Sequence, residues 1–199
     1  MDEIGEELYT EPAAIPLLPK FLQADTELKG ASRGTAYHKV LELLDFAKEY
    51  NEASLIEIIR AFTLEEKMSE EMADCIRISD ILAFLQCPVG RRMHEAAKRK
   101  NLYAEQPFVL GVDAEEVYPG SNSDETILVQ GIIDVFFEED GELVVLDYKT
   151  DRIHAAHELL EKYHAQLDYY AKALERMTGR KVKEKIIYSF TLQQEIALA

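Results

Sequence analysis

The chain has 199 residues, of which 47% are hydrophobic, and its formal net charge at pH 7 is −16. This length favours one compact unit with a sizeable core, and the lack of any run of about 18 apolar residues predicts a soluble, cytoplasmic protein with no membrane partner. The acidic balance argues against a free-standing protein that grips nucleic acid by bulk electrostatics. Cys75 and Cys87 are too few for a disulfide framework or a structural zinc site, and they are predicted to be small core residues.

The first half of the chain is predicted to be mostly helical. Residues 1–32 are polar and carry three prolines, which predicts an extended lead-in that joins a domain to something before it. From Gly34 apolar side chains recur at helical spacing as far as Ala47. Further helices are expected in ASLIEIIRAF, in SEEMADCIRI, in SDILAFLQ with Ser79 as its cap, and in VGRRMHEAAKRKNLY after Pro88.

One segment of this half, RRMHEAAKRK, is strongly basic in an acidic chain. Two interpretations stay open for it. It is a solvated helix face, or it contacts a nucleic acid backbone or another part of a larger protein.

From about residue 106 the hydrophobic period changes, and a sheet is predicted. PFVLGVDAEEVY is expected as a strand, PGSNSDE as a turn-rich loop, TILVQGIIDVFFEE as a second strand and ELVVLDYKT as a third. A long amphipathic helix from about Ala155 to Thr178 ends at Gly179, and KEKIIYSFTL supplies a last strand. The order helix, three strands, helix, strand predicts an α/β fold with helices prefixed to it.

The turn Asp140-Gly141 predicts a tight hairpin, because a type I′ turn needs positive φ at both central positions. Pairing the glutamates that flank this turn sets Asp134 directly opposite Asp147 and puts Lys149 on the same face. Like charges opposed in this way are destabilising. Two such carboxylates among apolar residues must therefore share a proton, find cations or bind a metal.

A divalent cation such as Mg²⁺ or Mn²⁺ would resolve this conflict of charges. The alternative is a cluster of salt bridges without any chemistry. The spacing of Asp147 and Lys149 aims a carboxylate and an ammonium at one point, which favours the chemical interpretation. With a metal, these groups are the equipment of phosphodiester hydrolysis.

Four motifs resemble those of the PD-(D/E)xK nucleases in their RecB-like form. GIID followed by LDYKTD is similar to the family signature, YHAQLDYYAKAL to its Q-x3-Y helix motif, RGTAYHKVLE to its leading G-x-x-x-H motif, and AEQPF to its Glu-x-Pro-Phe element. They follow the family's order across residues 33–190. The resemblance extends to the C-terminal nuclease domains of AddA-type helicase–nuclease subunits.

The resemblance implies a restriction-endonuclease-like core (αβββαβ), in which helices flank a central mixed sheet, with an additional N-terminal helical part. Residues 33–199 would form a single nuclease domain, mostly helical over 33–104 and with the sheet core over 105–199. Iron–sulfur relatives carry four cysteines and this chain has two, so no iron–sulfur cluster is expected.

For function, the resemblance implies a Mg²⁺- or Mn²⁺-dependent deoxyribonuclease of exonuclease type. It would hydrolyse DNA single strands delivered by a fused helicase, in double-strand-break processing and recombinational repair. The helicase and its ATP site would be missing from this chain, which has no GxxxxGK[ST] loop. An AddB-type subunit is the implied partner, and the bacterial cytoplasm, at the nucleoid, is the implied location.

The resemblance also assigns roles to individual residues. Lys149 becomes the catalytic lysine, and Gln166 and Tyr170, four apart on the long helix, share a face directed at the active site. The implied metal ligands are His38, Asp134, Asp147 and the backbone carbonyl of Tyr148.

Weaker expectations concern residues around this site. Arg33 and Arg152 are expected DNA phosphate contacts, and Glu105 is either a carboxylate at the edge of a DNA-binding site or a charge flanking a strand. Tyr163 is expected to pack or to lie at the solvent edge, and Asp151 to cap the turn after the third strand.

Two other functions stay open at this point. The chain could be a catalytically inactive module of the same fold that docks DNA or a partner subunit, although such a module need not keep an unfavourable carboxylate pair. It could also hydrolyse small phosphoesters, although no substrate loop for them is visible in the sequence.

Overall fold

The computed structural model describes residues 33–118, 120 and 125–198. The predicted lead-in over residues 1–32 and most of the predicted loop over 119–125 lie outside these residues. In the part that is described, no helix has both the length and the apolar character needed to cross a membrane.

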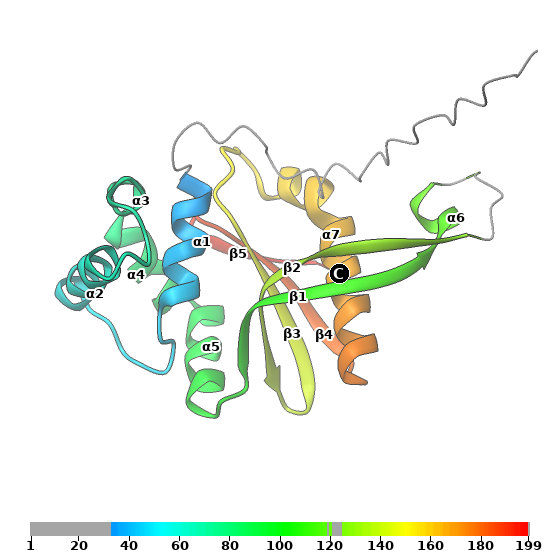
Figure 1. The fold of residues 1–199 in the computed structure, drawn as a ribbon, viewed down its shortest axis with the longest axis horizontal. Coiled ribbons are helices and arrows are strands. Elements are labelled where there is room, and N and C mark those ends of the chain that lie inside the picture. Colours follow the sequence, from blue (N-terminus) through cyan, green and yellow to red (C-terminus); the bar gives the residue numbers. More distant parts are fainter. Residues whose placement is uncertain (1–32, 119, 121–124, 199) are drawn as a thin grey trace, which may run out of the picture.

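A five-stranded mixed sheet forms the centre of the fold (Figure 1). The strand order is β1-β2-β3-β4-β5, with β3 and β4 parallel and the other neighbours antiparallel. The strands are β1 (Leu102–Asp113), β2 (Thr126–Glu139), β3 (Glu142–Lys149), β4 (Val182–Ser189) and β5 (Gln194–Leu198). The predicted α/β fold with a mixed sheet is therefore confirmed.

Helices cover both faces of the sheet, and each face has its own core (Figure 1). On one side Tyr37 and Phe84 pack against Val144, and on the other Leu167 and Leu174 of the long helix lie over the sheet. The helical part contains α1 (Arg33–Leu43), α2 (Glu52–Leu64), α3 (Glu70–Cys75), α4 (Ile78–Gln86) and α5 (Pro88–Lys98), α6 (Ala114–Val117) follows β1, and α7 (Ala156–Thr178) is the long helix.

Local chemistry explains where several helices begin and end. Pro88 occupies the first turn of α5, and the Cys87 sulfur accepts the Gly90 N–H at 3.4 Å, so this half-buried cysteine caps a helix. Gly179 ends α7 with φ 69°, in the left-handed conformation that glycine tolerates. The predicted cap at Ser79 is wrong, because α4 begins at Ile78 and its cap position is Arg77.

The first helix is shorter than its apolar spacing predicts. It ends at Leu43, and Ala47 is exposed beyond it. The Asp45 side chain accepts the Ala47 N–H at 3.1 Å, a local turn that competes with the helical hydrogen bonds. This turn brings Phe46 into the core.

Strand boundaries also differ from the expected ones. The first strand begins at Leu102 rather than near residue 107, and α6 replaces its expected end. The last expected strand, KEKIIYSFTL, ends early, because β4 stops at Ser189 and residues 190–193 form a turn; β5 follows this turn and was not predicted. The short β5 depends on pairing with β4, a long-range contact that a local pattern does not contain.

The hairpin register agrees with the prediction. Asp140 has φ 57° and Gly141 has φ 83°, and the flanking glutamates are paired. The register continues to the pair Val135 and Leu146, one position before the two aspartates, where the ladder ends. Asp134 and Asp147 are therefore neighbours at the open end of the hairpin, outside the ladder itself.

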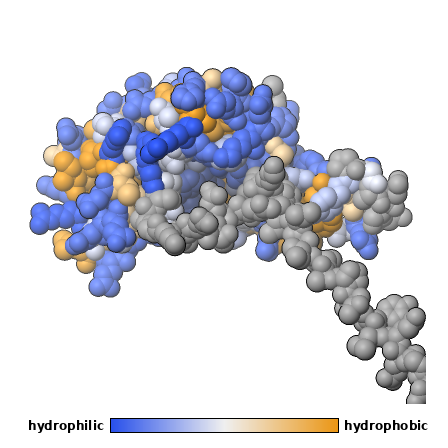
Figure 2. Space-filling model, turned by 90° about the horizontal axis from the view of Figure 1, so that it is seen from above, coloured by the Kyte–Doolittle hydropathy of each residue, from blue (hydrophilic) through white to orange (hydrophobic). Residues whose placement is uncertain are grey.

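The surface reflects the composition. In the view from above, hydrophilic side chains cover most of the described surface (Figure 2). Hydrophobic patches lie over the helical part and at the far end of the arm that β1 and β2 form together (Figure 2). Exposed apolar side chains include Leu64 on α2 and Val109 and Leu128 on the arm.

Candidate active site

Charged side chains gather where β3 ends, between α1 and α7. β3 is paired with β2 on one side and with β4 on the other, so apolar strands surround the charges and strengthen their interactions. The residues brought together are Asp134 from β2, Asp147 and Lys149 from β3, His38 from α1 and Gln166 from α7.

Asp147, Lys149 and Gln166 form one buried cluster. The Lys149 Nζ lies 2.6 Å from Oδ2 of Asp147, whose side chain is 1% exposed. The Gln166 amide donates to Asp147 Oδ1 at 3.3 Å, and its oxygen accepts from Lys149 Nζ at 3.4 Å. The same amide donates to the Tyr170 hydroxyl oxygen at 2.5 Å. Gln166 thus contacts both members of the aspartate–lysine pair, and Tyr170 holds Gln166.

His38 contacts two other groups to which the resemblance assigns metal ligation. Its Nδ1 lies 3.4 Å from Asp134 Oδ1, and its Nε2 lies 3.0 Å from the carbonyl oxygen of Tyr148. The other oxygen of Asp134 accepts the Tyr148 N–H at 2.8 Å. The His38 imidazole therefore contacts one carboxylate and one backbone carbonyl, each through a different ring nitrogen.

Glu105 belongs to this cluster and does not merely flank a strand. Its φ of 50° interrupts β1, and neither Glu105 nor Asp134 is paired although their neighbours are. Ligand atoms of His38, Glu105 and Asp134 lie within 4.8 Å of one another. Apart from its contact with Lys149, the buried Oδ2 of Asp147 has no hydrogen-bond partner among the described residues. Imidazole and carboxylate donors with a spare buried oxygen fit a divalent cation.

The electrostatics show an excess of negative charge. Burial alone would lower the pKa of His38, but the Asp134 and Asp147 carboxylates raise it to about 9. Burial raises the pKa of Asp147, which Lys149 opposes and Asp134 reinforces. Burial and the Asp134 charge raise the pKa of Glu105 to about 7. For Asp134, contacts with His38 outweigh burial and lower the pKa. The raised pKa values of Asp147 and Glu105 indicate too little positive charge around these two acids, and a cation would supply it.

The two arginines expected to contact phosphate have different surroundings. Arg33 donates to Asp80 at 3.0 Å, and Asp80, only 3% exposed, also accepts from the Tyr37 hydroxyl at 2.6 Å and from Gln193 at 3.2 Å. Arg33 is thus part of a buried network that supports α1. Arg152 is exposed between β3 and α7 and forms no ion pair with any residue that the structure describes.

Tyr163, which was expected to pack or to lie at the solvent edge, also contacts this site. The Lys149 Nζ lies 4.0 Å from the centroid of the Tyr163 ring. The Tyr163 hydroxyl donates to Asp151 at 2.9 Å, so Asp151 holds this ring. A signal was present in the sequence, because Tyr163 precedes Gln166 by three residues and so shares its helix face.

The basic segment of α5 lies elsewhere. Arg92 donates to Glu139 at 2.8 Å and to Glu184 at 2.8 Å, which favours a structural role for this residue. Lys98 is paired with Glu95 at 3.2 Å.

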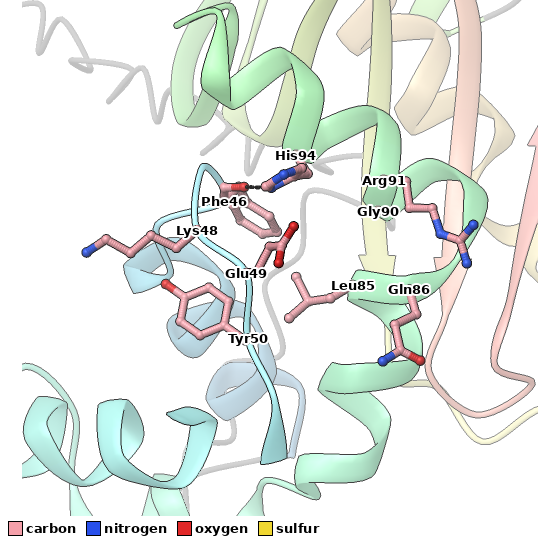
Figure 3. A pocket seen from close by; sticks show the side chains of 9 residues that line it. All are labelled: Phe46, Lys48, Glu49, Tyr50, Leu85, Gln86, Gly90, Arg91 and His94. Atoms are coloured by element: carbon pink, nitrogen blue, oxygen red, sulfur yellow. Dashed lines mark hydrogen bonds between the residues drawn. The ribbon is translucent and has the colours of Figure 1, made fainter. Parts of the chain in front are cut away.

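A pocket of about 260 Å³ lies between α5, the end of α4 and the loop after α1 (Figure 3). Its lining carries charges of both signs, from Arg91, Lys48 and Glu49. The His94 ring is hydrogen-bonded to the Phe46 carbonyl at 2.8 Å. It shares no residue with the carboxylate cluster. The buried charges, rather than this pocket, therefore mark the candidate active site.

Comparisons with known proteins show what the chain is similar to. Residues 16–196 match the PD-(D/E)XK nuclease superfamily. Over 95% of its length the chain is 39% identical to the A subunit of the ATP-dependent helicase/nuclease of Clostridium acetobutylicum, and over 92% it is 34% identical to that of Lachnoclostridium phytofermentans. It spans only 15% and 16% of these relatives. Because the family match contains β1 to β4, most of β5 and the buried aspartate–lysine cluster, the chain belongs to the PD-(D/E)XK nuclease superfamily.

Proposed function

We propose that this chain is a Mg²⁺- or Mn²⁺-dependent deoxyribonuclease domain that hydrolyses phosphodiester bonds. The observation that carries the proposal is the buried Asp147–Lys149 pair, with its short 2.6 Å contact, beside a histidine–carboxylate cluster. Membership of a nuclease superfamily supports the same conclusion.

The proposed metal ligands are His38, Asp134, Asp147 and the carbonyl of Tyr148, with Glu105 as a further carboxylate beside them. A bound metal would polarise a phosphoryl oxygen and lower the pKa of its bound water. Asp134 is held for this role by the Tyr148 N–H, and Asp147 by the Gln166 amide. A carboxylate repels phosphate, so the position of Glu105 favours a role toward the metal over a DNA contact.

Lys149 is the proposed catalytic lysine. Burial lowers its pKa, but the Asp147 and Asp134 carboxylates raise it above the ordinary value, so the side chain stays an ammonium. Its positive charge stabilises negative charge that develops on the phosphate. Gln166 and Tyr170 orient the pair from α7, and Arg152 is available for a neighbouring phosphate.

The relatives suggest the wider setting. Since they are named as subunits of an ATP-dependent helicase/nuclease, and this chain covers about a sixth of one of them, we propose that a helicase region delivers DNA single strands to it. In this proposal residues 1–32 join that region to one nuclease domain over 33–199. Cleavage is exonucleolytic, an AddB-type subunit is the partner, and the reaction serves double-strand-break repair in the bacterial cytoplasm, at the nucleoid.

Cleavage of end-labelled single-stranded DNA tests the activity. We expect the chain to degrade linear DNA in Mn²⁺, to leave a circular single strand intact, and to lose all cleavage with a chelator. Lys149→Ala should abolish cleavage, while Arg92→Ala should not. Cleavage that survives the chelator or the Lys149 substitution would contradict the proposal, and DNA binding without cleavage would favour an inactive docking module.

A further inference from the structure

The Lys149 ammonium is held by three groups, of which two have a second task. Asp147 lies 2.6 Å from it and is a proposed metal ligand, and Gln166 lies 3.4 Å from it and also donates to Asp147. The third group is the face of the Tyr163 ring, 4.0 Å from Nζ to the ring centroid. Tyr163 opens the stretch YHAQLDYYAKAL but is neither the glutamine nor the tyrosine of its Q-x3-Y motif.

An aromatic ring holds a cation differently from a carboxylate. It attracts the ammonium through its quadrupole, and it takes up no proton and coordinates no Mg²⁺ or Mn²⁺. A divalent cation on Asp147 would draw that carboxylate's charge away from Lys149. The contact with Tyr163 would remain, because nothing at the metal site competes for the ring.

The Tyr163 ring is fixed by the helix that carries it and by its hydroxyl. Tyr163 lies on α7, three residues before Gln166, so one helix positions both the Tyr163 ring and the Gln166 amide against Lys149. Its hydroxyl donates to Asp151 at 2.9 Å, and Asp151 also pairs with Lys162 at 2.6 Å. The segment just after β3 thus ties the ring to the strand that carries Lys149.

We propose that Tyr163 is a positioning residue, which holds the Lys149 ammonium toward the reacting phosphate while Asp147 serves the metal, and that Asp151 fixes the ring. This inference rests on the proposed function. Tyr163 touches neither the proposed metal ligands nor the phosphate, so its removal should change turnover rather than binding.

Three substitutions in the full chain test this role. Tyr163→Leu removes the ring, and we expect kcat for Mn²⁺-dependent cleavage to fall about tenfold, the scale of a partly desolvated cation–π contact. The KM for DNA and the Mn²⁺ affinity should stay within about twofold. Tyr163→Phe keeps the ring but loses its hydrogen bond to Asp151, so kcat should fall by only about threefold. Tyr169→Leu is the matched control, since its ring lies 5.8 Å from Lys172, away from the site, and it should lower Tm but leave kcat unchanged.

A spectroscopic measurement tests the contact without any activity. The ring current of Tyr163 should shift the ε-methylene proton resonances of Lys149 upfield in the wild type and in Tyr163→Phe, but not in Tyr163→Leu. If Tyr163→Leu does not fold, Asp151→Ala decides, because it removes the acceptor of the Tyr163 hydroxyl, with an expected loss of about threefold in kcat.

The outcomes separate this inference from the proposed function. A wild type that cleaves DNA through Lys149, together with a folded Tyr163→Leu of unchanged kcat, overturns the inference alone. Unchanged kcat in Asp151→Ala, or the absence of the ring-current shift in the wild type, also overturns it alone. A wild type without metal-dependent cleavage overturns the proposed function, and the inference with it.

Discussion

Both ends of the β2–β3 hairpin carry charged side chains, but their surroundings shift the pKa values of the acids in opposite directions. At the turn end, Glu139 accepts from Arg92 at 2.8 Å and pairs with Lys183 at 2.7 Å, and Arg92 lowers its pKa to about 2. At the open end, burial raises the pKa of Asp147 although Lys149 is 2.6 Å away. The strands are the same, so the difference lies in the partners and in the exposure to water.

This contrast distinguishes a structural ion cluster from the proposed active site. The side chains of Arg92 and Glu139 are 27% and 28% exposed, so water and two cations satisfy the acid. The side chains of Asp147 and Lys149 are 1% and 12% exposed, and further carboxylates crowd them. Buried acids that the protein leaves short of positive charge are expected where a ligand completes the balance.

The largest expected effect comes from replacing one acid by its amide at each end. Asp147→Asn should reduce cleavage about 100-fold or more and remove the Mn²⁺-dependent rise in Tm, because it deletes a metal ligand. Glu139→Gln should leave cleavage within about twofold. Cleavage rates and melting curves of both variants check this pair, and equal losses of activity would remove the functional distinction between the ends.

The next effect concerns pH in the metal-free protein. The pKa of His38 is raised from 6.5 to about 9, so its stabilisation is complete below pH 6.5 and is lost as pH rises through about 9. The raised pKa of Glu105, about 7 instead of 4.5, adds a loss between these values. We therefore expect Tm to fall from pH 5 to pH 9 without metal.

Mn²⁺ should reverse this fall, because it binds the deprotonated ligands. At about 100 times its Kd it adds about 2.7 kcal/mol to the free energy of unfolding. Melting curves between pH 5 and 9, with and without Mn²⁺, measure both effects, and His38→Asn is the control in which the upper part of the fall disappears. A Tm independent of pH and metal would contradict the balance of charges described here.

A smaller effect should differ in sign between the two ends. Without metal at pH 8, Glu105→Gln should raise the free energy of unfolding by about 0.5 kcal/mol, because it removes a charge repelled by Asp134. Glu139→Gln should lower it by about 1 kcal/mol, because Arg92 and Lys183 lose an ionic partner. Denaturant unfolding measures both values. Shifts of the same sign would show that the open end is as well balanced as the turn end.

The smallest effect is expected for two arginines near the ends of the β2–β3 hairpin, Arg152 after the open end and Arg180 near the turn. Arg152→Ala should raise the KM for DNA about twofold to threefold and weaken its salt dependence, with kcat unchanged, because one phosphate contact is lost. Arg180→Ala, which removes the partner of Glu138 near the turn, is the matched control and should leave KM unchanged. Titration of KM with salt distinguishes the two variants, and identical salt slopes would remove Arg152 from the DNA path.

Much of this arrangement follows from local rules in the sequence. The Asp-Gly turn sets the hairpin register, so it predicts that Asp134 and Asp147 lie close together. Helical spacing likewise aligns Gln166 with Tyr170, and the same rule would have included Tyr163.

Other features depend on contacts that a local pattern does not contain. The positive φ of Glu105 is an unfavourable conformation for that residue, and it occurs where β1 crosses the site. The strand β5 exists only because β4 offers an open edge. Arg33 was expected near phosphate, but its partner Asp80 lies on another helix, and only tertiary packing brings the two together.

The Asp80 network makes the support of α1 depend on residues far along the chain. Asp80 joins Arg33 and Tyr37 of α1 to Gln193 in the turn between β4 and β5. His38 lies on the next turn of α1 from Arg33, so a residue of that late turn helps to hold the helix that carries this histidine. A nascent chain that stops before residue 193 has both aspartates and the lysine but lacks this contact, so the proposed catalytic centre would gain its full support only once translation has passed that turn.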